Sequence, residues 1–211
     1  MTTRPWTEAD LVAVDLEGSG AQDRDHEAIL EVAAVPLRHG QPDVPHALST
    51  LVNPNRPIPQ RPWISPGIND QTLRVAPPLT RIASVLTAMI NGRWIVGHNV
   101  GVDWRLLRRH IPDLAPAGLI DTLALARATG IDGGRSLSTL VKNTGLDETM
   151  RLAVPGSQPH RALWDAAATA YLLSTLVDRH WSGGPPTFVD LRAVAGIRTE
   201  AEPTNEQPTL F

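Results

Sequence analysis

Residues 12–20 read VAVDLEGSG, and this stretch decides the fold that we expect. The short apolar run is typical of a buried strand, and Gly18 and Gly20 close it. Because successive side chains of a strand point to opposite faces, Asp15 and Glu17 are expected to project side by side from one face. Two adjacent carboxylates at the end of a buried strand repel each other and are costly to desolvate. The pair therefore needs a compensating group.

The composition is that of an ordinary globular domain, with 211 residues, of which 42% are hydrophobic and 19% charged. The formal net charge of −3 gives no global basic signature, so a nucleic acid would be held by a local basic patch or by metal ions. The sequence has no cysteine, which excludes disulfides and thiolate metal sites. It shows no secretory signal pattern and no apolar run of the ~18 residues that span a bilayer, so we expect a cytoplasmic protein.

Hydrophobic periodicity and turn signals predict an α/β domain on a mixed sheet, covering residues 1–181. Strands are expected at residues 11–17, 28–37, 46–54 and 93–99. Helices are expected at residues 79–92, 102–111, 120–130, 136–146 and 160–181. The composition changes after Trp181 to glycines, prolines, a short apolar island and a polar, acidic tail. We expect residues 182–211 to form a C-terminal extension with a flexible end.

Two further acids lie next to predicted strand and helix ends, where the side chains of a metal site could converge. Asp103 follows the strand at 93–99, and Asp165 lies in the long helix that begins near His160. Converging carboxylates are unstable unless a cation neutralises them, and two Mg²⁺ or Mn²⁺ ions about 3.5–4 Å apart can clamp a phosphate during in-line displacement. An imidazole is suited to take the proton of the attacking water, which favours His160 as general base.

Each of these residues, taken singly, also has an ordinary structural explanation. An acid at a strand end often faces solvent, and a histidine at a helix start is usually solvated. An aspartate at a helix start is usually an N-cap, which applies to Asp103 and to Asp121. The order of the motifs along the chain is what favours a site.

Together the motifs resemble those of the DnaQ-like DEDDh 3′-to-5′ exonucleases, a family that includes the epsilon proofreading subunit of DNA polymerase III. The resemblance extends over residues 10–177, through VAVDLEGSG, ILEVAAV, LVNPNRPIP, GIND, VGHNVGVDWRLL, LIDTLALAR and HRALWDAAATAYLL. It implies a ribonuclease-H-like mixed sheet flanked by helices. It also implies that Asp15, Glu17, Asp103 and Asp165 hold two divalent cations, Mg²⁺ or Mn²⁺, and that His160 is the general base.

The resemblance further implies that the 3′-terminal nucleotides of a single strand lie in a groove beside the metals. The residues expected to seat them or to shape the groove are Leu16, Gly18, Ser19, Ile68, His98 and Asn99. The sequence departs from the family pattern where Gly18 and Ser19 replace paired threonines and where Val102 replaces a common phenylalanine. These departures bear on how the terminal nucleotide is handled and leave the metal chemistry intact.

Other charged residues have less specific explanations. Glu31 matches a family position, and we expect it to be a structural hydrogen-bond acceptor on the second strand. The arginines of the helix at 102–111, together with Arg151 and Arg161, either contact phosphates or form a solvated basic face. The sequence leaves both explanations open.

The last five residues, QPTLF, resemble the short peptide with which many bacterial proteins dock on the DNA polymerase sliding clamp. Leu210 and Phe211 would fill an apolar pocket while Gln207 makes hydrogen bonds. A chance apolar C-terminus is the alternative, because short patterns with few fixed positions are common.

The activity that we expect is metal-dependent hydrolysis of phosphodiester bonds at the 3′ end of DNA, with release of 5′-mononucleotides. Its setting would be replication proofreading or DNA repair. One alternative is an exoribonuclease that trims RNA, since no residue pattern here tests for the 2′-hydroxyl. Another is a non-catalytic adaptor derived from a nuclease, against which the complete set of five site residues argues.

Overall fold

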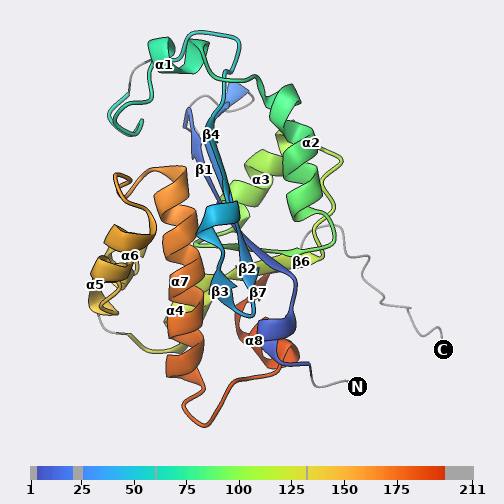
Figure 1. The fold of residues 1–211 in the computed structure, drawn as a ribbon, viewed down its shortest axis with the longest axis vertical. Helices are drawn as coiled ribbons and strands as arrows, with labels where there is room; N and C mark the ends of the chain where they lie inside the picture. The colour runs from blue at the N-terminus through green and yellow to red at the C-terminus, as the bar shows by residue number, and fades with distance from the viewer. Residues whose placement is uncertain (1–3, 21–25, 60, 132, 198–211) are drawn as a thin grey trace, which may run out of the picture.

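The computed structural model describes residues 4–20, 26–59, 61–131 and 133–197. These residues contain one mixed sheet with the strand order β3-β2-β1-β5-β6-β7, and β4 pairs with β2 on the same side as β3 (Figure 1). β1 runs antiparallel to β2 and parallel to β5, and β5 runs parallel to β6. The strands are β1 Leu11–Gly18, β2 Ile29–Arg38, β3 Gln41–Pro42, β4 Leu48–Leu51, β5 Trp94–Gly97, β6 Gly118–Asp121 and β7 Gly196–Ile197.

Helices cover both faces of this sheet, which confirms the predicted fold class (Figure 1). One face is covered by α2 (Leu79–Ile90) and α3 (Gly101–His110). The other is covered by α4 (Thr122–Ala128), α7 (Ala162–His180) and α8 (Phe188–Ala195). The shorter helices are η1 Trp6–Glu8, η3 Val44–His46, α1 Asp70–Arg74, α5 Leu137–Asn143 and α6 Asp147–Ala153. None of the helices among the described residues is long and apolar enough to cross a membrane.

The alternation of side chains along β1 determines which core layer each residue enters. Leu11 and Ala13 pack in the layer of α7, whereas Val12 and Val14 pack in the layer of α2 and α3. Burying a leucine or valine side chain stabilises the fold by about 1.5–3 kcal/mol, so a shift of one residue would be strongly unfavourable. The same alternation places Asp15 and Glu17 on the face of the sheet that α7 covers.

The predicted elements are present with shifted ends. The strand expected at 46–54 is limited to β4, because residues 44–46 form the 3-10 turn η3 with a proline in its first turn. The helix expected at 120–130 begins at Thr122, since residues 118–121 form β6. Asp121 Oδ1 accepts the backbone N–H of Leu123 at 2.9 Å, which confirms Asp121 as the N-cap.

Part of the expected C-terminal extension packs on the sheet. Phe188 of α8 contacts Trp94 of β5 edge-to-face, with ring centroids 5.1 Å apart, and Leu191 is fully buried. β7 then pairs antiparallel with β6. Residues 188–197 therefore belong to the sheet and its helical layer, while residues 198–211 lie outside the described part of the chain.

Candidate active site

Three carboxylates converge at the end of β1. Asp15, Glu17 and Asp165 each bring one oxygen to within 4.8 Å of the others. Asp15 and Glu17 project from β1, and Asp165 comes from the first turn of α7, which packs on that face. No second group of three potential metal ligands occurs in the part of the chain that the structure describes. The convergence that the sequence predicts for these three residues is therefore present.

Asp103 lies beside this group rather than within it. It occupies the first turn of α3, and its Oδ1 accepts the backbone N–H of Leu16 at 3.2 Å. Its negative charge still raises the pKa of Asp15, so the two side chains are neighbours. The predicted fourth ligand is thus held against β1 by a backbone hydrogen bond.

Burial and mutual repulsion raise the pKa values of these acids. Burial raises the pKa of the Asp15 carboxyl well above its usual range, and the charges of Asp103 and Asp165 raise it further. Burial also raises the pKa of Glu17 to about 7 and is the largest cause of the raised pKa values of Asp103 and Asp165. The protein therefore supplies too little positive charge and too few hydrogen bonds to keep all four acids fully ionised at neutral pH.

This donor set fits divalent cations. Carboxylate oxygens are the ligands that Mg²⁺ and Mn²⁺ prefer, and a bound cation would favour the ionised form of each raised acid. The residues placed to hold such ions are Asp15, Glu17 and Asp165, with Asp103 alongside.

His160 lies in the turn that leads into α7. Its φ of 66° is left-handed, which is uncommon for a residue other than glycine. Its backbone N–H donates to Asp165 Oδ2 at 3.1 Å, and its side chain is exposed. Its charge lowers the pKa of Glu17, which places the imidazole near the carboxylates. The position suits a group that exchanges a proton with solvent beside the site.

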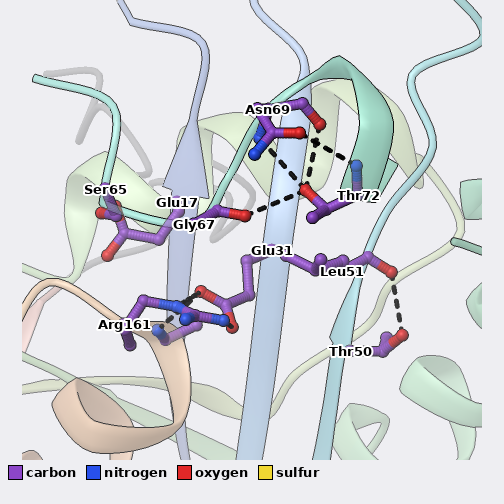
Figure 2. A network of polar contacts seen from close by, with 10 residues as sticks. Glu17, Glu31, Thr50, Leu51, Ser65, Gly67, Asn69, Thr72 and Arg161 are labelled. Atoms are coloured by element: carbon purple, nitrogen blue, oxygen red, sulfur yellow. Dashed lines mark hydrogen bonds and ion pairs between the residues drawn. The ribbon is translucent and has the colours of Figure 1, made fainter. Parts of the chain in front are cut away.

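Ser65 is a site residue that the sequence analysis did not single out. Its hydroxyl donates to Glu17 Oε2 at 2.9 Å, and the residue is buried (Figure 2). This hydrogen bond lowers the pKa of Glu17 and so opposes the effect of burial. Ser65 belongs to the proline-containing connection at 54–67, which carries no periodic signal of a site.

Glu31 and Arg161 form a second polar contact beside the carboxylates (Figure 2). Glu31 lies directly opposite Glu17 in the pairing of β1 with β2. It accepts hydrogen bonds from Arg161 Nε and Nη2 and from the backbone N–H of Ala162, at 2.9, 2.7 and 3.2 Å. The prediction that Glu31 is a structural hydrogen-bond acceptor is confirmed.

The predicted substrate residues of the first motif are held by the fold at the end of β1. The Leu16 side chain is half-buried against the core of α2 and α3. The pairing with β2 shifts register after Glu17, so Gly18 begins an irregular segment. Ser19 is buried, and its Oγ accepts the backbone N–H of Ala28 at 2.9 Å. The Ser19 hydroxyl therefore bridges the two strands.

Packing and hydrogen bonds within the protein also fix the remaining predicted substrate residues, Ile68, His98 and Asn99. Ile68 is buried beside Leu73, and Asn99 has a φ of 66° while its N–H donates to Asp121. The two ring nitrogens of His98 contact Thr122 Oγ1 and the carbonyl of Arg135, at 2.9 and 2.8 Å. Burial lowers the pKa of His98, which favours its neutral form. Its ring therefore ties the end of β5 to two other segments.

Comparison with known proteins identifies the family of this chain. The chain belongs to the exonuclease family whose RNase T model matches residues 12–173. Among curated proteins it is similar to the 3′-5′ exonuclease DinG of Bacillus subtilis (strain 168), with 26% identity over 191 residues, 88% of this chain and 19% of that protein. It is also similar to a DNA polymerase III subunit epsilon-like protein of Rhodobacter capsulatus, with 28% identity over 188 residues, 87% of this chain and 26% of that protein. The chain thus spans about a quarter or less of the length of these relatives.

Solved structures with this fold include other exonucleases. Exonuclease X in complex with 5′ overhanging duplex DNA has a TM-score of 0.63 and 28% identity, over 86% of this chain and 98% of that chain. Exonuclease I has a TM-score of 0.60 at 16% identity, over 81% of this chain and 41% of that chain, and supports the fold alone. The expected resemblance to DnaQ-like exonucleases and the expected fold are therefore confirmed.

Proposed function

We propose that this chain is a metal-dependent 3′-to-5′ exonuclease that removes mononucleotides from the 3′ end of DNA. The observation that carries the proposal is the convergence of Asp15, Glu17 and Asp165 at the end of β1, with Asp103 alongside. The similarity to DinG, a 3′-5′ exonuclease, supports the direction, and the similarity to Exonuclease X, whose structure contains DNA, supports the substrate.

The four acids would hold two divalent cations, Mg²⁺ or Mn²⁺. When bound, such ions supply positive charge to the phosphate and lower the pKa of coordinated water. The protein's part is to keep the acids together despite their repulsion. Strand pairing fixes Asp15 and Glu17, the Leu16 N–H fixes Asp103, and the start of α7 fixes Asp165.

His160 would act as the general base. Its imidazole takes a proton from water as the water oxygen bonds to phosphorus and the bond from phosphorus to the 3′-oxygen of the next nucleotide breaks. A 5′-mononucleotide leaves, and the released 3′-oxygen takes a proton from solvent, so the shortened strand ends in a 3′-hydroxyl. The exposed side chain of His160 then returns the proton to solvent.

The terminal nucleotides would lie against the wall formed by Leu16, Gly18, Ser19, Ile68, His98 and Asn99. Because the Ser19 hydroxyl and the His98 ring already contact the protein, we assign both residues to shaping the wall rather than to binding through those atoms. The terminal nucleotide would then be held by backbone groups and by the shape of this wall. Such binding does not need the side-chain hydroxyls of the threonines that Gly18 and Ser19 replace.

Degradation of matched oligonucleotides tests this function. Single-stranded DNA and RNA of the same sequence, labelled at the 5′ end, are incubated with the protein in Mg²⁺ and then with EDTA. We expect a ladder of DNA products that shorten from the 3′ end, slower degradation of RNA, and no products in EDTA. Faster degradation of RNA would assign the enzyme to RNA trimming, and no degradation of either would favour the adaptor.

The C-terminal peptide would tether this enzyme to the DNA polymerase sliding clamp during replication or repair. Gln207, Leu210 and Phe211 lie outside the described residues, so the proposal rests on the sequence and on the relatives from DNA polymerase III. Deletion of residues 207–211 should abolish binding to the clamp and leave degradation of short oligonucleotides unchanged. Equal clamp affinity of the two proteins would refute it. The cytoplasmic location expected from the sequence stays a prediction.

A further inference from the structure

The two ends of the Glu31–Arg161 ion pair differ strongly in exposure. The Glu31 side chain is 4% exposed, whereas the Arg161 side chain is 31% exposed. Arg161 Nε and Nη2 donate to the two carboxylate oxygens (Figure 2). Because the negative end is buried and the positive end reaches the surface, the pair presents positive charge to solvent although it is neutral as a whole.

The guanidinium of Arg161 is held in a fixed orientation. Two parallel hydrogen bonds to one carboxylate fix its plane, and the same carboxylate accepts the N–H of Ala162, the first residue of α7. A guanidinium fixed in advance loses little side-chain entropy when it binds a further anion. Arg161 is therefore prepared for an anionic ligand.

The remaining guanidinium nitrogen of Arg161, Nη1, lies beside the connection that carries Ser65 and Gly67. Among the described residues Nη1 has no hydrogen-bond partner, since both bonds of the side chain use Nε and Nη2. A Cβ placed on Gly67 would lie 3.8 Å from Nη1, so this edge faces the loop that ends at Ile68. The hydrogen bonds to Glu31 and, to a smaller extent, the charge of Glu17 raise the pKa of Arg161, so Glu17 lies near it as well.

Arg151 of α6 provides a contrast to Arg161. It pairs with Glu148 on α6, but both side chains are largely exposed, at 68% and 66%. Both charges of that pair face solvent on a surface helix. An ion pair of this kind contributes little to stability. The alternative of a solvated basic face therefore suits Arg151, whereas Arg161 has a directed, exposed donor.

We propose that Arg161 binds a phosphate group of the substrate strand through Nη1, and that Glu31 positions its guanidinium for this contact. The proposal rests on the proposed exonuclease function, which places a single strand beside Glu17. A planar guanidinium donor suits a phosphodiester oxygen, and the contact would hold the backbone of the strand without reading its bases.

Binding of labelled single-stranded DNA at several KCl concentrations tests the contact. All proteins carry Asp15→Asn, so that the strand stays intact during the measurement. The comparison is between this parent and the same protein with Glu31→Gln/Arg161→Gln, which removes both members of the ion pair and therefore leaves no buried charge unpaired. Removal of Arg161 should weaken binding about tenfold at low salt and reduce the slope of log affinity against log salt by about 0.7.

Two further measurements separate the contact from a structural effect. Arg151→Gln should leave both affinity and slope unchanged. A neutral methylphosphonate placed at one linkage near the 3′ end should remove the difference between the parent and Glu31→Gln/Arg161→Gln, and its position identifies the contacted phosphate. Equal slopes in the two proteins, from a wild type that degrades DNA, would overturn the contact and leave the function standing. A wild type that neither binds nor degrades DNA would overturn the function itself.

Discussion

The backbone N–H of His160 donates a 3.1 Å hydrogen bond to Oδ2 of Asp165. This bond closes the turn before α7 and ties the proposed general base to a proposed metal ligand. His160 adopts a left-handed φ of 66° there, a conformation that costs a residue other than glycine about 1–2 kcal/mol. Strained backbone of this kind persists where the surrounding contacts fix it, and here those contacts come from Asp165 and, through the next residue, from Glu31.

Replacement of the imidazole should affect turnover more than binding. His160→Ala keeps the backbone N–H that bonds Asp165, so we expect the fold and KM to change little while kcat falls about 10²–10⁴-fold. Steady-state kinetics on single-stranded DNA measure this split. His46→Ala, on the exposed turn η3, is the matched control and should retain full activity. A kcat of His160→Ala within twofold of the wild type would rule out the general base.

Neutralising one acid should stabilise the metal-free protein and abolish its activity. Asp15→Asn keeps the shape of the side chain and removes a charge whose burial is unfavourable, so its melting temperature in EDTA should exceed that of the wild type. Degradation of DNA in Mg²⁺ should be lost because a ligand oxygen is missing. Calorimetry in EDTA and the degradation assay provide the two readouts. An active Asp15→Asn protein contradicts the site.

The pH dependence of stability follows from the raised pKa values. An acid whose folded-state pKa exceeds its unfolded value of about 4 contributes stability below that value, and the contribution is lost as the pH rises through the folded pKa. For Glu17 the folded pKa is about 7, so in EDTA the loss falls between about pH 4 and about pH 7. The melting temperature of Glu17→Gln should therefore gain on that of the wild type across this window. The melting temperature of Glu17→Gln minus that of the wild type should rise with pH, and a difference that falls as the pH rises would contradict the raised pKa.

Loss of the Ser65 hydroxyl should raise the Mg²⁺ concentration that the enzyme needs for activity. Its hydrogen bond lowers the pKa of Glu17, so Ser65→Ala makes the ionised ligand less favourable. We expect the Mg²⁺ concentration for half-maximal activity to increase about tenfold, as is common when a group that orients a ligand is removed. Ser49→Ala, which replaces the exposed serine of β4, is the control. An unchanged Mg²⁺ requirement would show that Ser65 does not tune Glu17.

The packing of α8 predicts a stability effect beyond residue 181. Leu191 is fully buried in the layer of α7, so Leu191→Ala should lower the free energy of unfolding by about 2–5 kcal/mol. Val189→Ala, on the same helix and 63% exposed, should change it by less than about 0.5 kcal/mol. Denaturant unfolding of both variants makes the comparison. Equal stabilities would place α8 outside the folded domain.

The sequence contains the local features of the fold and of the acid cluster. Strand alternation places Asp15 and Glu17 on one face, and side-chain chemistry at the start of a helix identifies Asp121 as an N-cap. These features depend on neighbours in the chain, so periodicity reveals them. β3 and β7 have two residues each, too few for a periodic pattern, and the residues of β6 partly overlap the helix predicted at 120–130.

The contacts that surround the acids depend on the tertiary fold and could not be predicted in this way. Ser65 and Glu17 are 48 residues apart in sequence, and Arg161 and Glu31 are 130 apart. No local pattern indicates that a serine in a proline-containing connection will meet a strand end. The family resemblance drew attention to Glu31, but its partner, the orientation of the guanidinium and the difference in exposure became apparent only in three dimensions.

In the proposed function, the acids at the end of β1 support hydrolysis from a 3′ end. Its most direct test is the degradation of 5′-labelled single-stranded DNA in Mg²⁺ by the wild-type protein and by Asp15→Asn. We expect a ladder that shortens one nucleotide at a time with the wild type, release of 5′-mononucleotides, and no shortening with Asp15→Asn or in EDTA. Shortening by Asp15→Asn at the wild-type rate, or immediate release of the 5′ label as a mononucleotide, would contradict it.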